Sequence, residues 1–155
     1  MSDLTALSKP FEGKYVKTKP GPSKAAYVEH SDITQRLLQV VGPYSQEVRQ
    51  VVRGDVAEVV DKQSGEVKHH AKQDVIVGCV LALTVDVDGE RVTVEEVGEV
   101  EHPHNHSTDA SRLKFAVSDA YKRCAMRLGL GLHLWCQDHY FLNTVLTRDN
   151  GESAS

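Results

Sequence analysis

Apolar and polar positions alternate with a helical period between Ser107 and Gly131. At about 100° per residue, the apolar side chains gather in one stripe and charged side chains fall opposite. The stripe comprises Leu113, Val117, Ala120, Tyr121, Cys124 and Leu128, and the opposite face comprises Arg112, Asp119, Lys122 and Arg123. Thr108 or Asp109 can cap the first turn, and Gly129 or Gly131 can end the helix. The pattern predicts one long amphipathic helix.

Valine-rich segments precede this helix and predict strands. Residues 44–60 suit a half-exposed strand, bulged near Gly54. Residues 75–87 form the most apolar run of the chain and predict a central strand. Asp88-Gly89 is a strong hairpin signal, and residues 91–100 supply the returning strand. We therefore expect three antiparallel strands followed by the long helix.

The two ends of the chain are more polar. Residues 1–24 are rich in Lys, Pro, Ser and Gly, so we expect a flexible basic arm over residues 1–14. A short helix is expected from Ser31 or Asp32 to the stop at Gly42-Pro43, and a polar tail over residues 148–155. The predicted fold class is α+β, with one domain over residues 15–147 and the long helix across one face of the sheet.

Composition adds three expectations. The chain has 155 residues and no apolar run near the roughly 20 residues that a membrane span requires. With no signal-peptide pattern at its start, we expect a soluble, cytoplasmic protein with no membrane partner. The 3 cysteines are widely separated, and Cys79 and Cys124 lie in apolar segments, so we expect buried thiols and not disulfides.

Charge is distributed unevenly along the chain. The formal net charge is −4, yet residues 9–24 contain five lysines and one glutamate. Residues 112–127 contain five basic residues and one acid, whereas residues 55–101 contain twelve acids and four basic residues. Local potential attracts phosphates even where net charge is negative. A basic groove beside an acidic flank is one interpretation, and separately solvated charged faces are the other.

Histidines offer a second kind of chemistry. His102, His104 and His106 alternate in one segment, and His69-His70 lie earlier in the chain. Imidazoles are common metal ligands, but no CxxC or HExxH spacing accompanies them. A metal-dependent enzyme using this loop is therefore the alternative hypothesis. Our expectation is a polar connecting loop, no catalytic residue, no metal and no cofactor.

A set of cations on the long helix favours nucleic-acid binding. Lys122 and Arg123 follow Lys114 by about two turns, and a rigid helix fixes the spacing of cations along a phosphate backbone. At about 100° per residue the three side chains fan over about 180°, so they do not share one narrow stripe. From periodicity alone, a charged face that is simply solvated is as good an interpretation as a DNA-binding face.

The most specific motif of the chain is AVSDAYKR at residues 116–123, followed by Arg127-Leu128-Gly129. Together with several shorter segments between about Tyr15 and Phe141, this motif resembles the Rad52 superfamily of single-strand annealing proteins. Here an acid, a small residue, a large apolar residue and a Lys-Arg pair precede a glycine stop. The shorter similarities are Tyr27-Val28-Glu29, Val41-Gly42, Asp88-Gly89, Glu96-Val97-Gly98 and Asp138-His139-Tyr140-Phe141.

The resemblance implies a β-β-β-α core with the helix on a curved sheet, and protomers joined into a ring or helical filament. Such a homo-oligomer binds single-stranded DNA in a groove, backbone inward, and anneals complementary strands without ATP in homologous recombination and double-strand break repair. It implies groove roles for Lys114, Lys122 and Arg123, and for Lys19 or Lys17 in the loop before the first helix. This sequence departs from the family pattern where Met126 replaces a basic residue and Arg127 follows it, and Arg127 is included among the candidate DNA-binding residues.

The resemblance also predicts protein partners and a cellular location. It implies a recombinase, a nuclease or a single-strand binding protein as a further partner, and association with the nucleoid if the source is a bacterium or phage. A purely structural self-assembling subunit is a third hypothesis. It differs from the first by forming assemblies that do not bind DNA.

Overall fold

The computed structural model describes residues 1–153, which form two compact units. The first unit comprises Met1–Gln46, Leu83–Val94 and the chain from Cys124 onward, and the second comprises Glu47–Ala82 and Glu95–Arg123. Four long elements contribute residues to both units: β3 (Ser45–Val56), β6 (Lys72–Val87), β7 (Glu90–Glu99) and α3 (Asp109–Arg127). The mixture of helices and antiparallel strands confirms the predicted α+β class.

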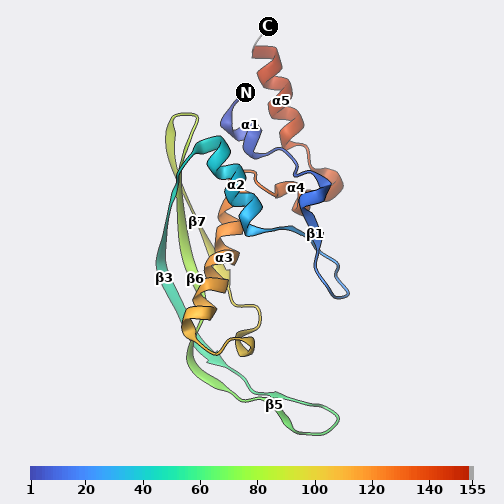
Figure 1. The fold of residues 1–155 in the computed structure, drawn as a ribbon, viewed down its shortest axis with the longest axis vertical. Helices are drawn as coiled ribbons and strands as arrows, with labels where there is room; N and C mark the ends of the chain where they lie inside the picture. Colours follow the sequence, from blue (N-terminus) through green and yellow to red (C-terminus); the bar gives the residue numbers. More distant parts are fainter. Residues whose placement is uncertain (154–155) are drawn as a thin grey trace. The chain divides into compact units, whose positions relative to one another are not determined.

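The elements follow one another along the chain as drawn in Figure 1. The helices are α1 (Asp3–Leu7), η1 (Gly13–Tyr15), α2 (His30–Val41), η2 (Pro103–Asn105), α3 (Asp109–Arg127), α4 (Leu132–Cys136), η3 (Gln137–His139) and α5 (Leu142–Ser153). The strands are β1 (Val16–Thr18), β2 (Ala26–Val28), β3 (Ser45–Val56), β4 (Val59–Val60), β5 (Val67–His69), β6 (Lys72–Val87) and β7 (Glu90–Glu99).

The main sheet has 3 strands in the order β3-β6-β7. The apolar run 75–87 lies in β6, so the prediction of a central strand there is confirmed. The hairpin turn between β6 and β7 is also confirmed, because Asp88 and Gly89 have φ of 50° and 84°. Positive φ at both central residues is what a tight two-residue turn between twisted strands requires.

The β4–β5 hairpin in the second unit was not predicted as a separate element. The expected strand over residues 44–60 divides into β3 and β4, and β5 pairs antiparallel with β4. A turn that includes residues 62–64 connects them. Asp61 holds this turn, because its Oδ1 accepts hydrogen bonds from the backbone N–H groups of Gln63 at 2.8 Å and Ser64 at 3.1 Å.

In the first unit, the N-terminus corrects the expectation of a flexible arm over residues 1–14. Residues 3–7 form α1, which Ser2 caps by accepting a hydrogen bond from the Thr5 N–H at 3.2 Å. Leu7 is fully buried, and Asn143 Nδ2 donates to the Thr5 carbonyl at 2.9 Å. The prediction is wrong here because α1 packs against α2 and α5, which are distant in the sequence.

The C-terminal segment of the first unit is also more regular than expected. The polar tail predicted over residues 148–155 is helical as far as Ser153, because α5 continues to that residue, and residues 154–155 lie outside the described part. Asn150 on α5 donates from Nδ2 to Thr5 Oγ1 at 2.7 Å. A polar sequence therefore forms a helix that is held by hydrogen bonds to α1.

The short helix α2 begins at His30, with Glu29 as its N-cap, slightly before the predicted cap at Ser31 or Asp32. It ends at Gly42 as predicted, where φ is 75°. Cys79 and Cys124 are fully buried, which confirms the expectation of buried thiols. Among residues 1–153, no helix combines the length and apolar character that crossing a bilayer requires.

Candidate nucleic-acid interface

The candidate interface is built on α3, and Thr108 fixes where this helix begins. Thr108 Oγ1 accepts a hydrogen bond from the Ser111 N–H at 3.1 Å, and its carbonyl accepts from the Arg112 N–H at 3.2 Å. This is the capping role that the sequence predicted for Thr108 or Asp109. Gly129, with φ of 92°, ends the helix as expected.

Small residues bring α3 very close to β7 in the second unit, where β3, β6 and β7 lie side by side and α3 runs along them (Figure 1). A Cβ atom at Gly98 would lie 2.0 Å from the Ala116 carbonyl oxygen and 2.6 Å from the Ala120 nitrogen. Both alanines are fully buried. The small residues of the AVSDAYKR segment therefore allow helix backbone to touch strand backbone, which holds α3 rigidly.

Asp119 links the strand to the basic pair. Its Oδ2 accepts a hydrogen bond from the Glu99 backbone N–H of β7 at 3.0 Å and another from Arg123 Nε at 3.3 Å. The side chain of Arg123 remains 41% exposed. Because the carboxylate is anchored to the sheet, it orients the guanidinium while leaving much of it in solvent.

Lys114, Lys122 and Arg123 all lie on the part of α3 that belongs to the second unit. Lys114 is exposed, and Lys122 and Arg123 are half-buried. The structure thus places the three cations on one helix, where their positions span about 180° around the helix axis.

The other predicted cations belong to the first unit. Arg127 is the exposed last residue of α3, and Lys19 is exposed in the turn between β1 and β2. Lys17 lies on β1, where its Nζ donates to Glu29 Oε1 at 2.6 Å and this hydrogen bond raises the pKa of Lys17. The contact with Glu29 offsets the positive charge locally. DNA contacts by Lys17, Lys19 and Arg127 stay a prediction.

Arg112 corrects the predicted basic face, because it is only 3% exposed. Its guanidinium donates to the carbonyl oxygens of Pro103 at 3.2 Å and His106 at 2.6 Å, and to Asp109 Oδ1 at 3.0 Å. Helical phase placed Arg112 opposite the apolar stripe. The prediction failed because the preceding loop folds over the first turns of α3, and the chain within ten residues supplies all three acceptors.

Asp109 joins this buried arginine to the sheet. Its Oδ1 also accepts a hydrogen bond from the Ile76 backbone N–H at 3.1 Å, and its Oδ2 accepts from Arg53 at 3.0 Å. The bond from Ile76, together with those from Arg53 and Arg112, lowers the pKa of the Asp109 carboxyl. These contacts stabilise the start of α3 and leave Arg112 with a structural role.

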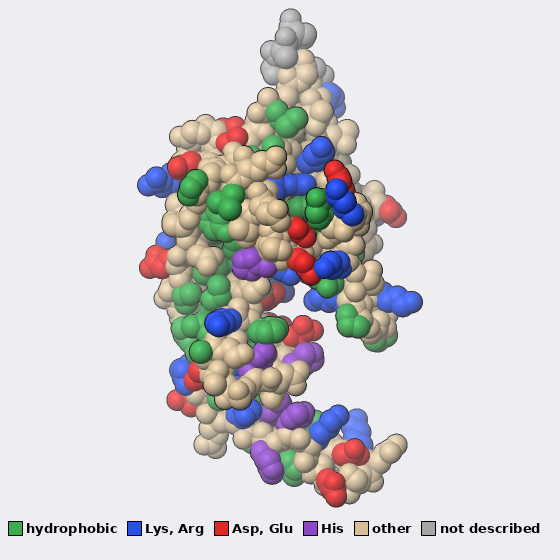
Figure 2. Space-filling view, in the orientation of Figure 1, with side chains coloured by type: hydrophobic (Ala, Val, Ile, Leu, Met, Phe, Trp, Pro, Cys, Tyr) green, Lys and Arg blue, Asp and Glu red, His purple; other side chains and the backbone are tan. Residues whose placement is uncertain are grey.

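The histidines at positions 69, 70, 102, 104 and 106 lie in the second unit, and those at 69, 104 and 106 contact protein groups. On the face seen in Figure 2, His side chains gather around the loop before α3 and around the β4–β5 hairpin. His104 Nε2 lies 2.8 Å from the Ala57 carbonyl oxygen, and the His104 ring stacks on His69 with centroids 5.0 Å apart. Within residues 1–153 no group of three or more His, Cys, Asp or Glu side chains is arranged to hold a metal ion.

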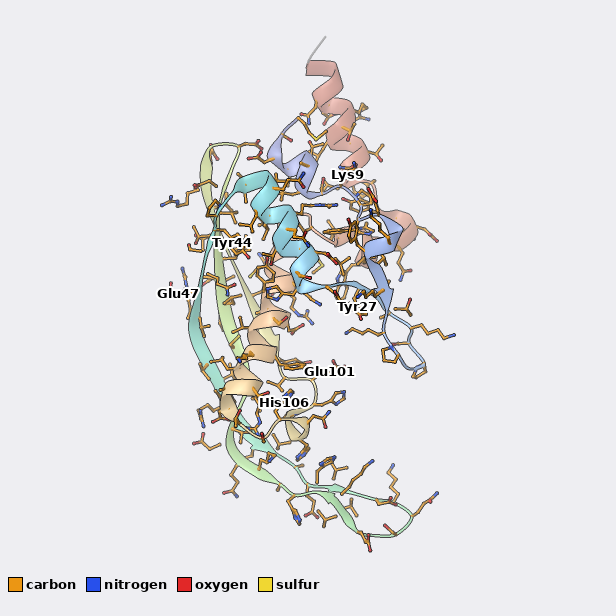
Figure 3. The ribbon with its side chains drawn as sticks, viewed as in Figure 1. Lys9, Tyr27, Tyr44, Glu47, Glu101 and His106 are labelled. Carbon is orange, nitrogen blue, oxygen red and sulfur yellow. The ribbon has the colours of Figure 1, made fainter. Side chains whose placement is uncertain are left out.

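Sequence reasoning also missed Phe115, an aromatic residue near the helical cations. Phe115 is 56% exposed on α3, and its ring centroid lies 4.4 Å from that of His106. In Figure 3, His106 lies beside the N-terminal turns of α3. The available signal was helical phase, since Phe115 falls outside the apolar stripe that the same helix otherwise follows.

Comparison with protein families decides the relationship. Residues 3–153 match the family described as Rad52/22 family double-strand break repair protein. The chain belongs to the Rad52/22 family. The match begins at α1 and ends at the end of α5, so it includes both terminal segments that the sequence had led us to treat as arm and tail. No curated protein matches the chain.

Membership of the Rad52/22 family implies a role in double-strand break repair and recombination. The family consists of annealing and repair proteins, which are not typical enzymes, and it implies DNA binding. The resemblance recognised from the AVSDAYKR segment is thereby confirmed at the level of the family. The same segment carries the helix–sheet contact, the anchored carboxylate and the Lys-Arg pair described above.

Proposed function

We propose that this protein binds single-stranded DNA and anneals complementary strands without ATP, as a homo-oligomeric ring or filament, in homologous recombination. Lys114, Lys122 and Arg123 contact the phosphate backbone in this proposal. Lys19 or Lys17 and Arg127 contribute further contacts. The protein itself forms and breaks no covalent bond in this reaction, so its work is to hold a strand in a form that a second strand can pair with.

The observation that carries the proposal is the anchoring of Arg123. Asp119 receives the Glu99 N–H from the sheet and Arg123 Nε from its own helix on one oxygen. The guanidinium has five N–H donors in a planar fork, so its bond to Asp119 leaves donors for a phosphate. An arginine oriented in advance loses less conformational entropy when it binds.

The acidic net charge of −4 fits the proposal when charge is considered locally. The cations lie on α3, whereas most of the acids lie between residues 55 and 101. In a ring or filament each protomer would present the same helix, so the cations would recur along one track. Repetition of a few contacts per protomer gives strong binding with no sequence preference.

The direct test is annealing of two complementary oligonucleotides by the purified protein, with no nucleotide present. We expect a faster approach to duplex than in protein-free solution, together with an assembly larger than the 17.1 kDa chain in light scattering. Assemblies that leave the annealing rate and oligonucleotide mobility unchanged at low salt would instead support the structural-subunit hypothesis and contradict the proposal.

A further inference from the structure

An exposed aromatic ring lies among the cations of α3. Phe115 directly follows Lys114, and spacings of three and four residues place Phe115, Ser118 and Lys122 on one face of the helix. Phe115 is 56% exposed although the helix has a fully buried face that includes Ala116 and Ala120. Single exposed apolar residues are common on proteins. What distinguishes this one is the ring next to it.

His106 and Phe115 form a pair of rings with centroids 4.4 Å apart and planes at 53°. His106 is fixed at two points. Its ring Nδ1 lies 2.8 Å from Ser111 Oγ, and its carbonyl oxygen accepts a hydrogen bond from the buried Arg112 at 2.6 Å. Phe115 itself stands on a helix that Gly98 and Asp119 hold against the sheet. The pair is therefore organised before any ligand arrives.

We propose that Phe115, supported by His106, is a base-stacking contact for single-stranded DNA. The inference rests on the proposed function, because Lys114 and Lys122 would hold the phosphates of the same strand. Every nucleobase has a π-face, so stacking adds affinity without sequence preference. Stacking uses the face of a base and leaves its Watson–Crick edge open, which is what pairing with a second strand needs.

The chemistry favours a single strand as the occupant. In a duplex the base faces are already stacked on their neighbours, so an aromatic side chain on a helix surface gains little from them. Lysines on both sides of Phe115 along the helix provide charge complementarity to a polyanion. A phenyl ring between cations is thus suited to an unpaired strand that presents a base and phosphates together.

The test compares Phe115→Ala with the unaltered protein on two probes of equal length: a thymidine oligonucleotide and an abasic strand with the same phosphates. Loss of one base–aromatic stack should weaken thymidine binding by about 5- to 100-fold. The abasic strand should bind both proteins equally, and the salt dependence should stay unchanged because no phosphate contact is lost. Phe115→Trp should retain the affinity.

Two further variants complete the experiment. Phe115→Leu keeps an apolar side chain without a π-system, so it should reproduce the thymidine-specific loss even if Phe115→Ala folds poorly. Phe141→Ala removes an aromatic side chain that is 71% exposed in the first unit and should leave both affinities unchanged. Circular dichroism and light scattering establish that each variant folds and assembles normally.

Unchanged thymidine affinity in Phe115→Leu, or an equal loss on the abasic strand, would overturn the stacking contact. A smaller assembly with matching losses on both probes would assign Phe115 to a protomer contact and would also overturn it. Failure of the proposed function has a different signature, because the unaltered protein would then bind neither probe at low salt.

Discussion

The helix α3 carries two Asp–Arg pairs that have the same chemistry but different roles. Asp109 pairs with Arg112 near the start of the helix, and Asp119 pairs with Arg123 two to three turns later. Each aspartate also accepts a backbone N–H from the sheet, from Ile76 in one case and from Glu99 in the other. The two arginines differ in exposure, since 4% of the Arg112 side chain and 41% of the Arg123 side chain are exposed.

This difference in exposure determines which groups each arginine can bind. Arg112 gives its donors to Pro103, His106 and Asp109, so it fixes the loop before α3 and has little surface to offer a ligand. Arg123 donates through Nε to one carboxylate and keeps part of its fork in solvent. A buried guanidinium contributes to folding, whereas a half-exposed one anchored from behind is suited to binding phosphate.

The largest expected effect is on the buried pair. Arg112→Ala should lower the free energy of unfolding by about 3 kcal/mol or more, because it removes a buried guanidinium together with its hydrogen bonds to Pro103, His106 and Asp109. Urea unfolding followed by circular dichroism measures this change. Arg112→Lys is the matched control, and it should recover only part of the loss because a lysine cannot reach three acceptors with a planar fork. Full stability in Arg112→Ala would contradict a structural role.

The close contact between β7 and α3 at Gly98 should have the next largest effect on the free energy of unfolding. Gly98→Ala should destabilise the protein by about 1–3 kcal/mol, because the added methyl group would overlap the Ala116 carbonyl and push α3 from β7. Gly13→Ala is the control, since nothing lies within 4 Å of a Cβ built there. Equal unfolding midpoints for the two variants would refute the close approach of helix and strand.

Acid should weaken the contacts of Asp109. The pKa of Asp109 is lowered from its usual 3.8, first by the Ile76 N–H and then by its arginine partners. A carboxyl with a lowered folded-state pKa stabilises the protein above pH 3.8, and this stability is lost as the pH falls through the folded-state value. Asp109→Asn should therefore lose less stability than the unaltered protein between pH 5 and pH 3, as measured by urea unfolding. A parallel decline in both proteins would contradict this assignment.

The smallest expected effect on stability is at the exposed pair. Arg123→Ala should change the free energy of unfolding by only about 0.3–0.5 kcal/mol, the usual value of an exposed ion pair one helical turn apart. Thermal unfolding of this variant beside Arg112→Ala tests the comparison directly. Destabilisation of Arg123→Ala as large as that of Arg112→Ala would remove the distinction between them.

Local signals in the sequence predicted much of this fold. The amphipathic period of α3, the apolar run of β6 and the Asp88-Gly89 turn each depend on neighbouring residues, so each could be recognised. By contrast, α1 is only 5 residues long, and it receives hydrogen bonds from Asn143 and Asn150 at the other end of the chain. A period cannot be read from so short a segment, and no local pattern reports a distant partner.

The candidate site divides in the same way. Lys114, Lys122 and Arg123 lie on the predicted helix because helical phase is a local property. The burial of Arg112 depends on how the loop over residues 103–106 folds back, which phase does not encode. The anchoring of Asp119 by Glu99 depends on the packing of α3 against β7, so the sequence indicated the acid but not its role.

The most direct test of the central claim is the salt dependence of oligonucleotide affinity for the double variant Lys122→Ala/Arg123→Ala. We predict weaker binding and a slope of log affinity against log salt reduced by about 1.4, because each lost phosphate contact on a single strand removes about 0.7. Normal circular dichroism must accompany this result. A folded double variant with the affinity and slope of the unaltered protein would contradict the assignment of α3 as the DNA-binding helix.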